Sequence, residues 1–462
     1  MEPASEQIAK FLKLKGVKYV VLCSGSRNKF LINAFVKHFK VFDHFDERSA
    51  AFFSLGINKY FGALKSIVCM TSGTAVVEAF PAVIEAYYSG INLLIISADL
   101  PGHYPEKIFP QRIDQKKIFG KFAEFSEVDI FSSSTHLLLL DPLGPNHWNI
   151  CYEEEDFCAN IRFVIKPKAR QLRGIEEVSQ KKLYFISQVY KSLNENEKKQ
   201  LSLLKKANCI VDVFNSKEVK SLISSTVLPS DTLRETFSEI VIIGGRPNFR
   251  GWRRLVQDSV ILKKIRLKLL NIESCKFKLK KREQLSKSPV KKNKPVEFKE
   301  TVFLQTILKT YSGADFFIGN SLLSYLMADL KTDATVFGNR GANGVDGLVS
   351  TFAGLCVGSR LLVGCIGDLS FLYDTQGLHL LKNLTNKNWL LFVFNNKGGL
   401  IFKRFDLDKG LSTNAKKILR LKHNYRLRMA AEIFGLPYTS VLKPQDLKQL
   451  KPPLVAEIII SQ

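Results

Sequence analysis

Asp368 and Asn396 each follow an apolar segment of the chain with the character of a buried strand. Asp368 comes after "RLLVGCIG", Asn396 comes after "NWLLFVFN", and the interval between them has room for one helix and one strand. Such a step places the two residues at neighbouring strand ends, on one edge of a parallel sheet. Carboxylate, amide and backbone carbonyl oxygens are the hard ligands that Mg²⁺ prefers, and phosphate oxygens can complete its coordination. The pair therefore predicts a site for a metal ion and a diphosphate.

Glycines beside these two residues favour the same interpretation. Gly367, Gly398 and Gly399 let the backbone approach a diphosphate closely. A helix beginning after "GDLS" can direct its N-terminus at the phosphates. The competing interpretation is structural, because a single Gly-Asp or Asn-Asn after a strand is usually a turn or a helix cap. The two motifs together, each after an apolar strand, favour the metal site.

The composition predicts a globular protein of two or three domains. The chain has 462 residues, of which 45% are hydrophobic. Its first residues, "MEPASEQIAKFLKLKGVKYVVL", lack the pattern of a signal peptide, and no apolar run is long enough to span a bilayer. We therefore expect a cytoplasmic protein without membrane insertion. The eight cysteines form no Cys-x-x-Cys pair, which argues against a zinc site or a disulfide framework.

The net charge of +25 calls for an anionic partner or a solvated basic segment. The richest run, from Lys263 to Lys294, holds 13 Lys or Arg residues against two Glu. No recognition-helix, RNA-binding or zinc-finger pattern accompanies it. A solvated basic linker is the favoured interpretation, and binding to nucleic acid or anionic lipid is the alternative.

The elements that must position Asp368 and Asn396 alternate between strand and helix. This alternation predicts an α/β fold in which two parallel-sheet domains flank a small α/β middle domain. We place the first domain at residues 1–165, the middle domain and its basic linker at 166–298, and the third domain at 299–462. The middle part shows two short buried strands, within "NCIVDVF" and "EIVIIGG".

Further motifs resemble one family of thiamine-diphosphate enzymes. "GDL" followed by "NN" is similar to the Mg²⁺–diphosphate motif of the class, with Leu as its third residue. The family is 2-succinyl-5-enolpyruvyl-6-hydroxy-3-cyclohexene-1-carboxylate (SEPHCHC) synthase of menaquinone biosynthesis. The resemblance covers both outer domains and is weak in the middle, which looks shorter than is usual for the family. It rests on "GSR", "FDERSAAFFSLG", "TSGTAVVEAFPAVIEAYYSG", "PQRIDQKKIFGKF", "NRGANGVDGLVSTFAG", "GDLSFLYDTQGLHLL" and "NNKGGLIF".

The resemblance implies a cofactor site of thiamine diphosphate with Mg²⁺ or Mn²⁺. Asp368, Asn396 and the carbonyl of Gly398 would hold the metal. Val345 would bend the cofactor, although ordinary loop packing also explains an apolar residue there. The remaining cofactor contacts would be Ser321, Gly367, Leu369, Ser370 and Ile401.

Glu47, in "DER", would be the catalytic glutamate that shares a proton with the pyrimidine ring of the cofactor. Without the resemblance, Glu47 reads as an acidic residue at a helix N-terminus or as a partner of Arg48. In such enzymes the two ends of the cofactor lie on different subunits. The resemblance therefore implies a homodimer or homotetramer in which Glu47 and Asp368 meet across an interface.

The substrates that the resemblance implies are 2-oxoglutarate and isochorismate, which together carry four carboxylates. Arginine suits bidentate carboxylate recognition. Phe402 would contribute to an apolar wall. Arg253 and Arg254 rest on a loose match, for which a surface helix is the plainer explanation. The residues that match substrate-contacting positions are Ser26, Arg27, Gln111, Arg340, Phe402, Arg253 and Arg254.

Two positions depart from the family pattern. Leu100 replaces the arginine of "ADRP", and Tyr325 replaces the last residue of "NSxxxR". Losing a charged hydrogen-bond partner costs about 1.5–3 kcal/mol. Arg112, His103 or Lys107 could compensate.

Three functions follow as hypotheses. The first is decarboxylation of 2-oxoglutarate and addition of the succinyl semialdehyde carbanion to isochorismate. The second is a thiamine-diphosphate decarboxylase or carboligase with a different 2-oxo acid or acceptor, as Leu100 and Tyr325 suggest. The third is a non-catalytic paralogue that binds nucleic acid or another anion through the basic run, against which the presence of Asp368, Asn396 and Glu47 argues.

Overall fold

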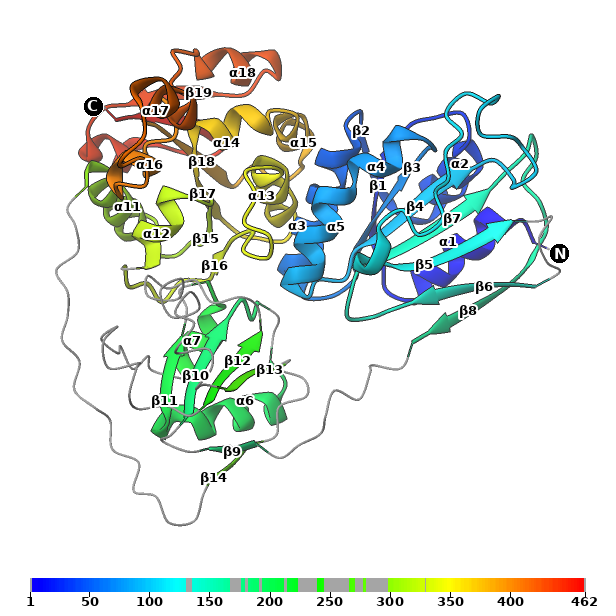
Figure 1. The fold of residues 1–462 in the computed structure, drawn as a ribbon, viewed down its shortest axis with the longest axis horizontal. Coiled ribbons are helices and arrows are strands. Elements are labelled where there is room, and N and C mark those ends of the chain that lie inside the picture. Colours follow the sequence, from blue (N-terminus) through cyan, green and yellow to red (C-terminus); the bar gives the residue numbers. More distant parts are fainter. Residues whose placement is uncertain are drawn as a thin grey trace.

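Two α/β units, the first and the third along the chain, lie side by side, and a smaller middle unit lies below the third (Figure 1). The computed structural model describes residues 2–129, 135–166, 176–178, 182–190, 193–211, 214–222, 239–244, 266–270, 277–279, 298–328 and 330–460.

The first unit is built on a six-stranded parallel sheet in the order β2-β1-β3-β4-β7-β5. Its strands are nearly continuous apolar runs because helices cover both faces, as expected for a parallel sheet. The strands are β1 (Tyr19–Cys23), β2 (Lys40–His44), β3 (Ser66–Met70), β4 (Leu94–Asp99), β5 (Glu124–Asp129) and β7 (Asn146–Cys151). The helices are α1 (Ala4–Leu14), α2 (Lys29–His38), α3 (Glu47–Phe61), α4 (Thr74–Glu78), α5 (Phe80–Ser89) and the 3₁₀ turn η1 (Gly120–Phe122). A separate parallel pair joins β6 (Thr135–Leu140) to β8 (Asn160–Ile165).

The middle unit holds a four-stranded parallel sheet in the order β11-β10-β12-β13 and a two-stranded pair of β14 and β9. The sequence predicted two of these strands, and the structure adds the rest. The elements are β9 (Glu176–Val178), β10 (Lys182–Ser187), α6 (Glu195–Ser202), η2 (Leu203–Lys206), β11 (Asn208–Val211), α7 (Lys217–Leu222), β12 (Glu239–Gly244), β13 (Arg266–Leu270) and β14 (Phe277–Leu279).

The third unit repeats the design of the first, with a parallel sheet in the order β16-β15-β17-β18-β20-β19. The strands are β15 (Asp315–Ile318), β16 (Val336–Phe337), β17 (Leu362–Gly367), β18 (Trp389–Asn395), β19 (Tyr438–Val441) and β20 (Leu454–Ile459). The helices are α11 (Lys299–Thr310), α12 (Leu322–Ala328), α13 (Leu348–Cys356), α14 (Asp368–Tyr373), α15 (Gly377–Asn383), α16 (Ile401–Arg404), α17 (Thr413–Arg420), α18 (Leu427–Ile433) and the 3₁₀ turn η4 (Pro444–Gln449).

Helices α3 and α13 join the first and third units into one hydrophobic core, and they lie next to each other in Figure 1. Glycines make this approach possible. A Cβ on Gly56 would lie 2.3 Å from the carbonyl oxygen of Thr351, and one on Gly354 would lie 2.1 Å from that of Phe53. Neither position has room for a side chain, so the two backbones are in direct contact.

Candidate active site

Asp368 lies at the point where β17 ends and α14 begins. The residue is 3% exposed, its Oδ1 accepts a hydrogen bond from the Leu369 N–H at 2.8 Å, and its Oδ2 accepts one from the Gly398 N–H at 2.9 Å. The last bond ties the end of β17 to the loop after β18, which is the neighbouring strand. The predicted juxtaposition of Asp368 with the "NNKGG" loop is thus present in the structure.

The helix here begins one turn earlier than the sequence predicted. Asp368 is the first residue of α14, and Gly367 caps the helix in an extended conformation. A helix N-terminus favours an acidic side chain because backbone N–H groups point toward it. This explains why the Leu369 amide donates to the carboxylate.

His423 approaches Asp368 from a segment 55 residues further along the chain. Its Nε2 lies 3.2 Å from Asp368 Oδ2, and its side chain is 4% exposed. The segment Arg420–His423 packs against the loop of Gly398 and Gly399, here called the glycine loop. The Gly399 N–H donates to the Arg420 carbonyl at 2.6 Å. Gly398 has φ 127°, and a Cβ there would lie 2.6 Å from the same carbonyl oxygen. Only glycine therefore fits beneath this segment.

The residues around Asp368 fit a hard metal ion with a diphosphate. An ionised carboxylate offers about four acceptor positions. Within the described part of the chain, Asp368 accepts one hydrogen bond on Oδ1 and two on Oδ2, so capacity remains on Oδ1. Burial raises the pKa of the Asp368 carboxyl, while the Gly398 and Leu369 N–H groups and His423 lower it. Asn396 is 8% exposed at the next strand end, and its amide oxygen would complete the oxygen donor set.

Glu47 is the first residue of α3, at the end of β2. Asp46 caps this helix by accepting a hydrogen bond from the Ser49 N–H at 2.8 Å. Burial raises the pKa of the Glu47 carboxyl, and the negative charges of Asp46 and Glu78 raise it further. A carboxyl with a raised pKa holds its proton to higher pH, which suits proton exchange with a ligand.

A buried polar chain ties the N-terminus of α3 to the third unit. Ser49 Oγ lies 2.7 Å from Ser350 Oγ, and Asp374 accepts hydrogen bonds from the Ser350 N–H at 2.7 Å and its hydroxyl at 2.9 Å. Arg48 donates to the Tyr373 carbonyl at 3.2 Å and lies over the Tyr373 ring. These contacts fix the first turn of α3, and with it the backbone of Glu47.

Asp374 gives this junction a measurable pH dependence. It is completely buried, and burial raises its pKa to about 7. The folded state therefore binds a proton that the unfolded state has already released, so this group lowers the free energy of unfolding as pH rises from about 4 to about 7. At 1.36 kcal/mol per pKa unit, Asp374 should lower the free energy of unfolding by about 4 kcal/mol across this pH range. We expect Asp374→Asn to flatten the pH dependence of unfolding in this window, as measured by urea denaturation at several pH values. A variant with the slope of the parent would show that Asp374 titrates normally.

Arg27 and Gln111 meet at the carboxyl end of the first sheet. The Arg27 guanidinium donates to the Gln111 carbonyl at 2.8 Å, to the Pro110 carbonyl and to the Ser72 hydroxyl. Gln111 adopts φ 56°, a left-handed conformation that is uncommon for a residue with a side chain. Such backbone strain is concentrated at functional sites.

Arg340, Ser321 and Val345 lie together in the loops after β15 and β16. The Arg340 guanidinium donates to Asn320 Oδ1 at 2.7 Å, and the Asn320 amide donates to the Gly344 carbonyl at 2.6 Å. Ser321 has φ 63° and precedes α12, and Val345 is 46% exposed. The apolar Val345 side chain is therefore available for contact with a ligand.

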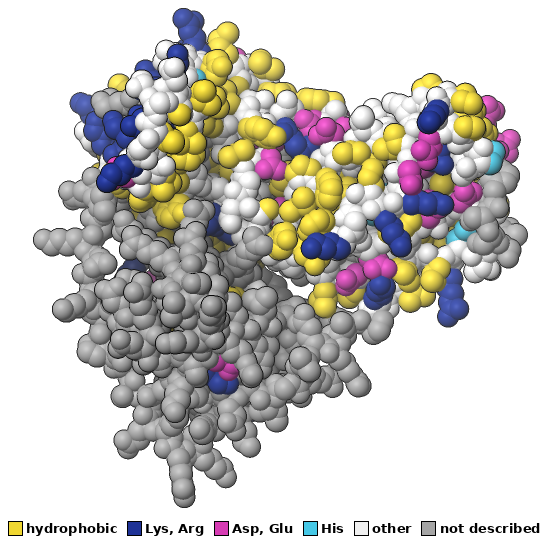
Figure 2. All heavy atoms as spheres, viewed as in Figure 1, with side chains coloured by type: hydrophobic (Ala, Val, Ile, Leu, Met, Phe, Trp, Pro, Cys, Tyr) yellow, Lys and Arg dark blue, Asp and Glu magenta, His cyan; other side chains and the backbone are white. Residues whose placement is uncertain are grey.

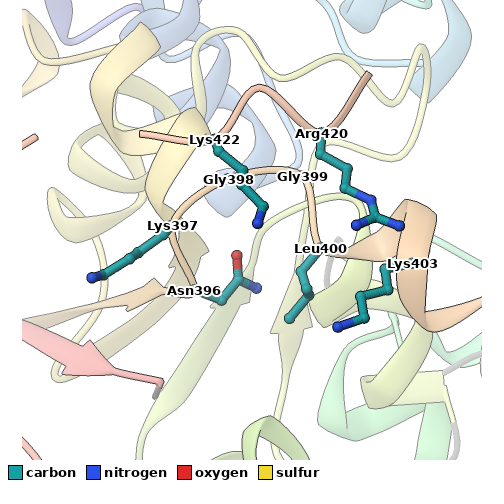
Figure 3. Close-up of a pocket in the computed structure, with 8 residues that line it drawn as sticks. All are labelled: Asn396, Lys397, Gly398, Gly399, Leu400, Lys403, Arg420 and Lys422. Carbon is teal, nitrogen blue, oxygen red and sulfur yellow. The ribbon is translucent and has the colours of Figure 1, made fainter. Parts of the chain in front are cut away.

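A pocket opens beside the glycine loop (Figure 3). Arg420, one of its basic residues, is paired with Asp408, whose Oδ2 lies 2.6 Å from Arg420 Nε. Lys and Arg side chains also gather over α16 and α17 on the face shown in Figure 2. The pocket therefore carries positive charge next to the predicted metal site. It is lined by Asn396, Lys397, Gly398, Gly399, Leu400, Lys403, Arg420 and Lys422.

The structure thus forms three groups of predicted residues. One is centred on Asp368 and the glycine loop, which continues into Ile401 and Phe402 of α16. The second joins Arg27 to Gln111, with Ser26 exposed beside them, and the third surrounds Arg340. Within the described part of one chain, no hydrogen bond or ion pair joins Glu47 to Asp368. Arg253, Arg254 and most of the basic run Lys263–Lys294 lie outside the described residues, which include only 266–270 and 277–279 of that run.

The two departures from the family pattern have structural partners. The Leu100 N–H donates to Asp99 Oδ1, and Asp99 pairs with Arg112 at 2.7 Å. The charge of Arg112, one of the suggested substitutes, is therefore already compensated. The Tyr325 ring lies 5.2 Å from the Phe405 ring. Tyr325 thus packs against the segment that follows Phe402.

The sequence is similar to those of known proteins along nearly its whole length. Residues 3–118 match the family described as "Thiamine pyrophosphate enzyme, N-terminal TPP binding domain". The chain is 27% identical to a SEPHCHC synthase of Akkermansia muciniphila, over 95% of the chain and 91% of that protein. It is 28% identical to one of Bacillus velezensis, over 95% and 90%.

Solved structures show the same fold. The benzoylformate decarboxylase of Polynucleobacter necessarius superimposes with a TM-score of 0.71 at 16% identity, covering 100% of this chain and 99% of that one. A thiamin diphosphate-dependent enzyme from Mycobacterium smegmatis gives 0.69 at 15% identity, with 100% of both chains covered.

Residues 3–118 thus match the N-terminal domain of thiamine pyrophosphate enzymes, and the whole chain has the fold of such enzymes. Along nearly its whole length the chain is similar to SEPHCHC synthases. The predicted fold class, family resemblance and cofactor are therefore confirmed, while the metal and the individual site residues stay predictions. Among the described residues, no helix is long and apolar enough to cross a membrane.

Proposed function

We propose that this protein decarboxylates 2-oxoglutarate and transfers the remaining four-carbon unit to isochorismate, giving SEPHCHC in menaquinone biosynthesis. The observation that carries the proposal is the buried Asp368, bonded to the Gly398 N–H of the neighbouring loop. This arrangement occurs in a chain that matches proteins of that name along 95% of its length. Thiamine diphosphate, when bound, supplies the electron sink that decarboxylation of a 2-oxo acid requires.

The chain's own residues then have separate tasks. Asp368, Asn396 and the Gly398 carbonyl would hold the metal ion that carries the diphosphate. Leu369, Ser370 and Ser321 would lie against the phosphates. Glu47 would hold and return a proton at its carboxyl oxygen, a role favoured by its raised pKa.

The substrate carboxylates would lie among positively charged and apolar side chains. Arg27 and Arg340 are each held by hydrogen bonds to the protein, so their guanidinium groups are oriented before a substrate binds. Lys403 and Lys422 add positive charge at the pocket of Figure 3. Ile401 and Phe402 would exclude water from the reacting atoms.

A second candidate function is a carboligase of the same class with a different donor acid or acceptor. Leu100 and Tyr325 favour it, because each stands where the family resemblance expects an arginine. A bulky apolar or aromatic residue in place of a carboxylate clamp favours a substrate with fewer charges.

A substrate panel separates the two candidates. Purified protein is given Mg²⁺, thiamine diphosphate and single 2-oxo acids, and CO₂ release is measured. Isochorismate is then added, and the adduct is identified by mass spectrometry. Turnover of 2-oxoglutarate with formation of the adduct supports the first proposal. Release of CO₂ from another acid alone supports the second.

The active unit is proposed to be a dimer in which Glu47 of one subunit faces Asp368 of the other. In one chain the two residues share no bond within the described part, and large hydrophobic side chains are exposed on both outer units. Figure 2 shows such side chains on the face that carries α18 and on the face of α3 and α5. The exposed large hydrophobic residues of the outer units include Phe45, Tyr87, Tyr373, Met429 and Ile433. A homo-oligomer would cover such surfaces.

Subunit complementation tests the shared site. Glu47→Gln and Asp368→Asn homo-oligomers are each expected to be inactive. Mixed by refolding together, they should regain about a quarter of the parent activity, because half of the dimers are mixed and one of their two sites is intact. Co-refolding each variant with itself is the control. A mixture that stays inactive would place both residues in one subunit's site.

A further inference from the structure

Lys59 and Glu85 form a charged pair inside the protein, where α3 and α5 of the first unit meet the third unit. Lys59 is 0% exposed and Glu85 is 2% exposed, and Lys59 Nζ lies 3.7 Å from Glu85 Oε1. Burial lowers the pKa of Lys59 to about 8, and the charge of Glu85 opposes this shift. Burying both charges is costly, and an apolar pair of similar volume is often equally stable. The pair therefore calls for an explanation beyond stability.

Lys59 binds the loop after β16, from the third unit. Its Nζ donates to the Gly338 carbonyl at 2.7 Å and to Asn339 Oδ1 at 2.9 Å. The Asn339 amide in turn donates to Thr351 Oγ1 of α13 at 2.8 Å. Lys59 thus holds Gly338 and Asn339, the first two residues of the loop.

Glu85 binds the other end of the same loop. Its Oε1 accepts a hydrogen bond from the Gly341 N–H at 2.9 Å, and its Oε2 accepts one from the Ala342 N–H at 2.7 Å. The Ser89 hydroxyl also donates to Oε1, at 2.7 Å. A Cβ on Gly341 would lie 2.5 Å from the Glu85 carbonyl, so this backbone contact requires glycine.

Arg340 is the residue between these two anchors. Its guanidinium donates to Asn320 Oδ1 at 2.7 Å and to Ser324 Oγ at 3.2 Å, at the end of β15 and in α12. The backbone on either side of Arg340 is therefore held by the first unit. Its side chain is oriented by the third unit and lies over the Phe214 ring of the middle unit, 5.4 Å from the ring centroid.

We infer that Lys59 and Glu85 are positioning residues for Arg340, holding the Gly338–Ala342 loop so that the guanidinium faces a substrate carboxylate. This inference rests on the proposed function only in giving Arg340 a carboxylate to bind. The pair acts through the loop and touches no substrate itself.

Glu85→Gln tests the inference with little change in volume. An amide has one acceptor oxygen, whereas the Gly341 and Ala342 N–H groups require two. We expect kcat/KM for 2-oxoglutarate to fall about 10- to 100-fold, mainly through KM, because misplacing a binding group by about 1 Å has effects of this size. Glu195→Gln, whose side chain is 89% exposed, is the matched control and should be unchanged.

A double-variant cycle separates positioning from a general structural effect. If Glu85 acts through Arg340, adding Glu85→Gln to Arg340→Ala should reduce kcat/KM by less than about twofold. If the losses in kcat/KM caused by the two single substitutions combine fully in the double variant, the inference is overturned. Turnover by the parent protein decides the proposed function, and the comparison between variants decides this inference, with whichever 2-oxo acid the parent accepts.

Hydrogen exchange of the cofactor-free protein tests whether Glu85 holds the loop, without an activity assay. Glu85→Gln should speed exchange of the Gly341 and Ala342 amides at least about tenfold and leave β17 amides protected. Unchanged protection of the loop would overturn the inference. If Glu85→Gln does not fold, Ser89→Ala is put through the same measurements, because it removes one hydrogen bond to Glu85. Unchanged hydrogen exchange of the loop and an unchanged KM in Ser89→Ala would also overturn the inference.

Discussion

Replacing Asp368 with asparagine is expected to remove metal-dependent cofactor binding. Asp368 is the only carboxylate that the predicted metal site draws from the strand ends of the third sheet. An amide has no negative charge and only one oxygen donor. We expect the affinity for thiamine diphosphate in the presence of Mg²⁺ to fall about 100-fold or more, since changing groups that merely support a metal ligand already costs 10- to 100-fold. Isothermal titration calorimetry at fixed Mg²⁺ measures this loss directly.

Two controls make the Asp368→Asn result specific. Asp333→Asn changes an exposed aspartate of the same unit and should bind the cofactor as the parent does. A thermal unfolding scan without cofactor checks that Asp368→Asn folds, and the parent alone should gain stability from Mg²⁺ with thiamine diphosphate. An Asp368→Asn protein that keeps parental affinity would remove Asp368 from the metal site.

The sequence made the ends of the outer strands predictable, because their position follows from simple periodicity. Continuous apolar runs such as "LLVGCIG" must be buried, and polar residues directly after them must lie at the sheet edge. Asp368 and the Gly398 loop are therefore found where the pattern put them. The same reasoning was weaker in the middle unit, where strands such as β13 carry Lys and Arg and lack a continuous apolar run.

Residues that act across long sequence separations could not be predicted in this way. His423 reaches Asp368, and Glu85 reaches the Gly341 amide, through contacts between elements far apart in the chain. Neither residue belongs to a local pattern that signals its partner. Gly56 and Gly354 are similar, since only the crossing of α3 and α13 shows why both lack side chains. Tertiary packing, rather than local preference, decides these roles.

The junction of α3 and α13 links these contacts to the proposed chemistry. α3 carries Glu47 at its first turn and Lys59 at its last, and both turns are bonded to the third unit. One helix therefore positions both the proposed catalytic acid and the Arg340 loop of a subunit. In the proposed dimer this acid faces Asp368 of the partner subunit, so the rigid α3 fixes the contributions of one chain to two different active sites.

Replacing Glu47 with glutamine is expected to lower kcat about 10²- to 10⁴-fold, the usual contribution of a positioned acid or base. The amide keeps the volume of the side chain and can still form hydrogen bonds, but it cannot release or accept a proton. Thiamine diphosphate affinity should therefore change much less than in Asp368→Asn. Steady-state kinetics with the accepted 2-oxo acid, together with calorimetry of cofactor binding, measure the two effects separately.

Glu78→Gln provides the matched control and adds a pH test. Glu78 is an exposed neighbour whose negative charge raises the pKa of Glu47. Removing that charge lowers the pKa, so Glu47 loses its proton at lower pH. If the protonated carboxyl is the active form, the alkaline limb of the kcat profile should shift to lower pH in Glu78→Gln while the maximal rate is kept. A Glu47→Gln protein with parental kcat, or a profile that does not respond to Glu78, would assign the proton transfer to another group.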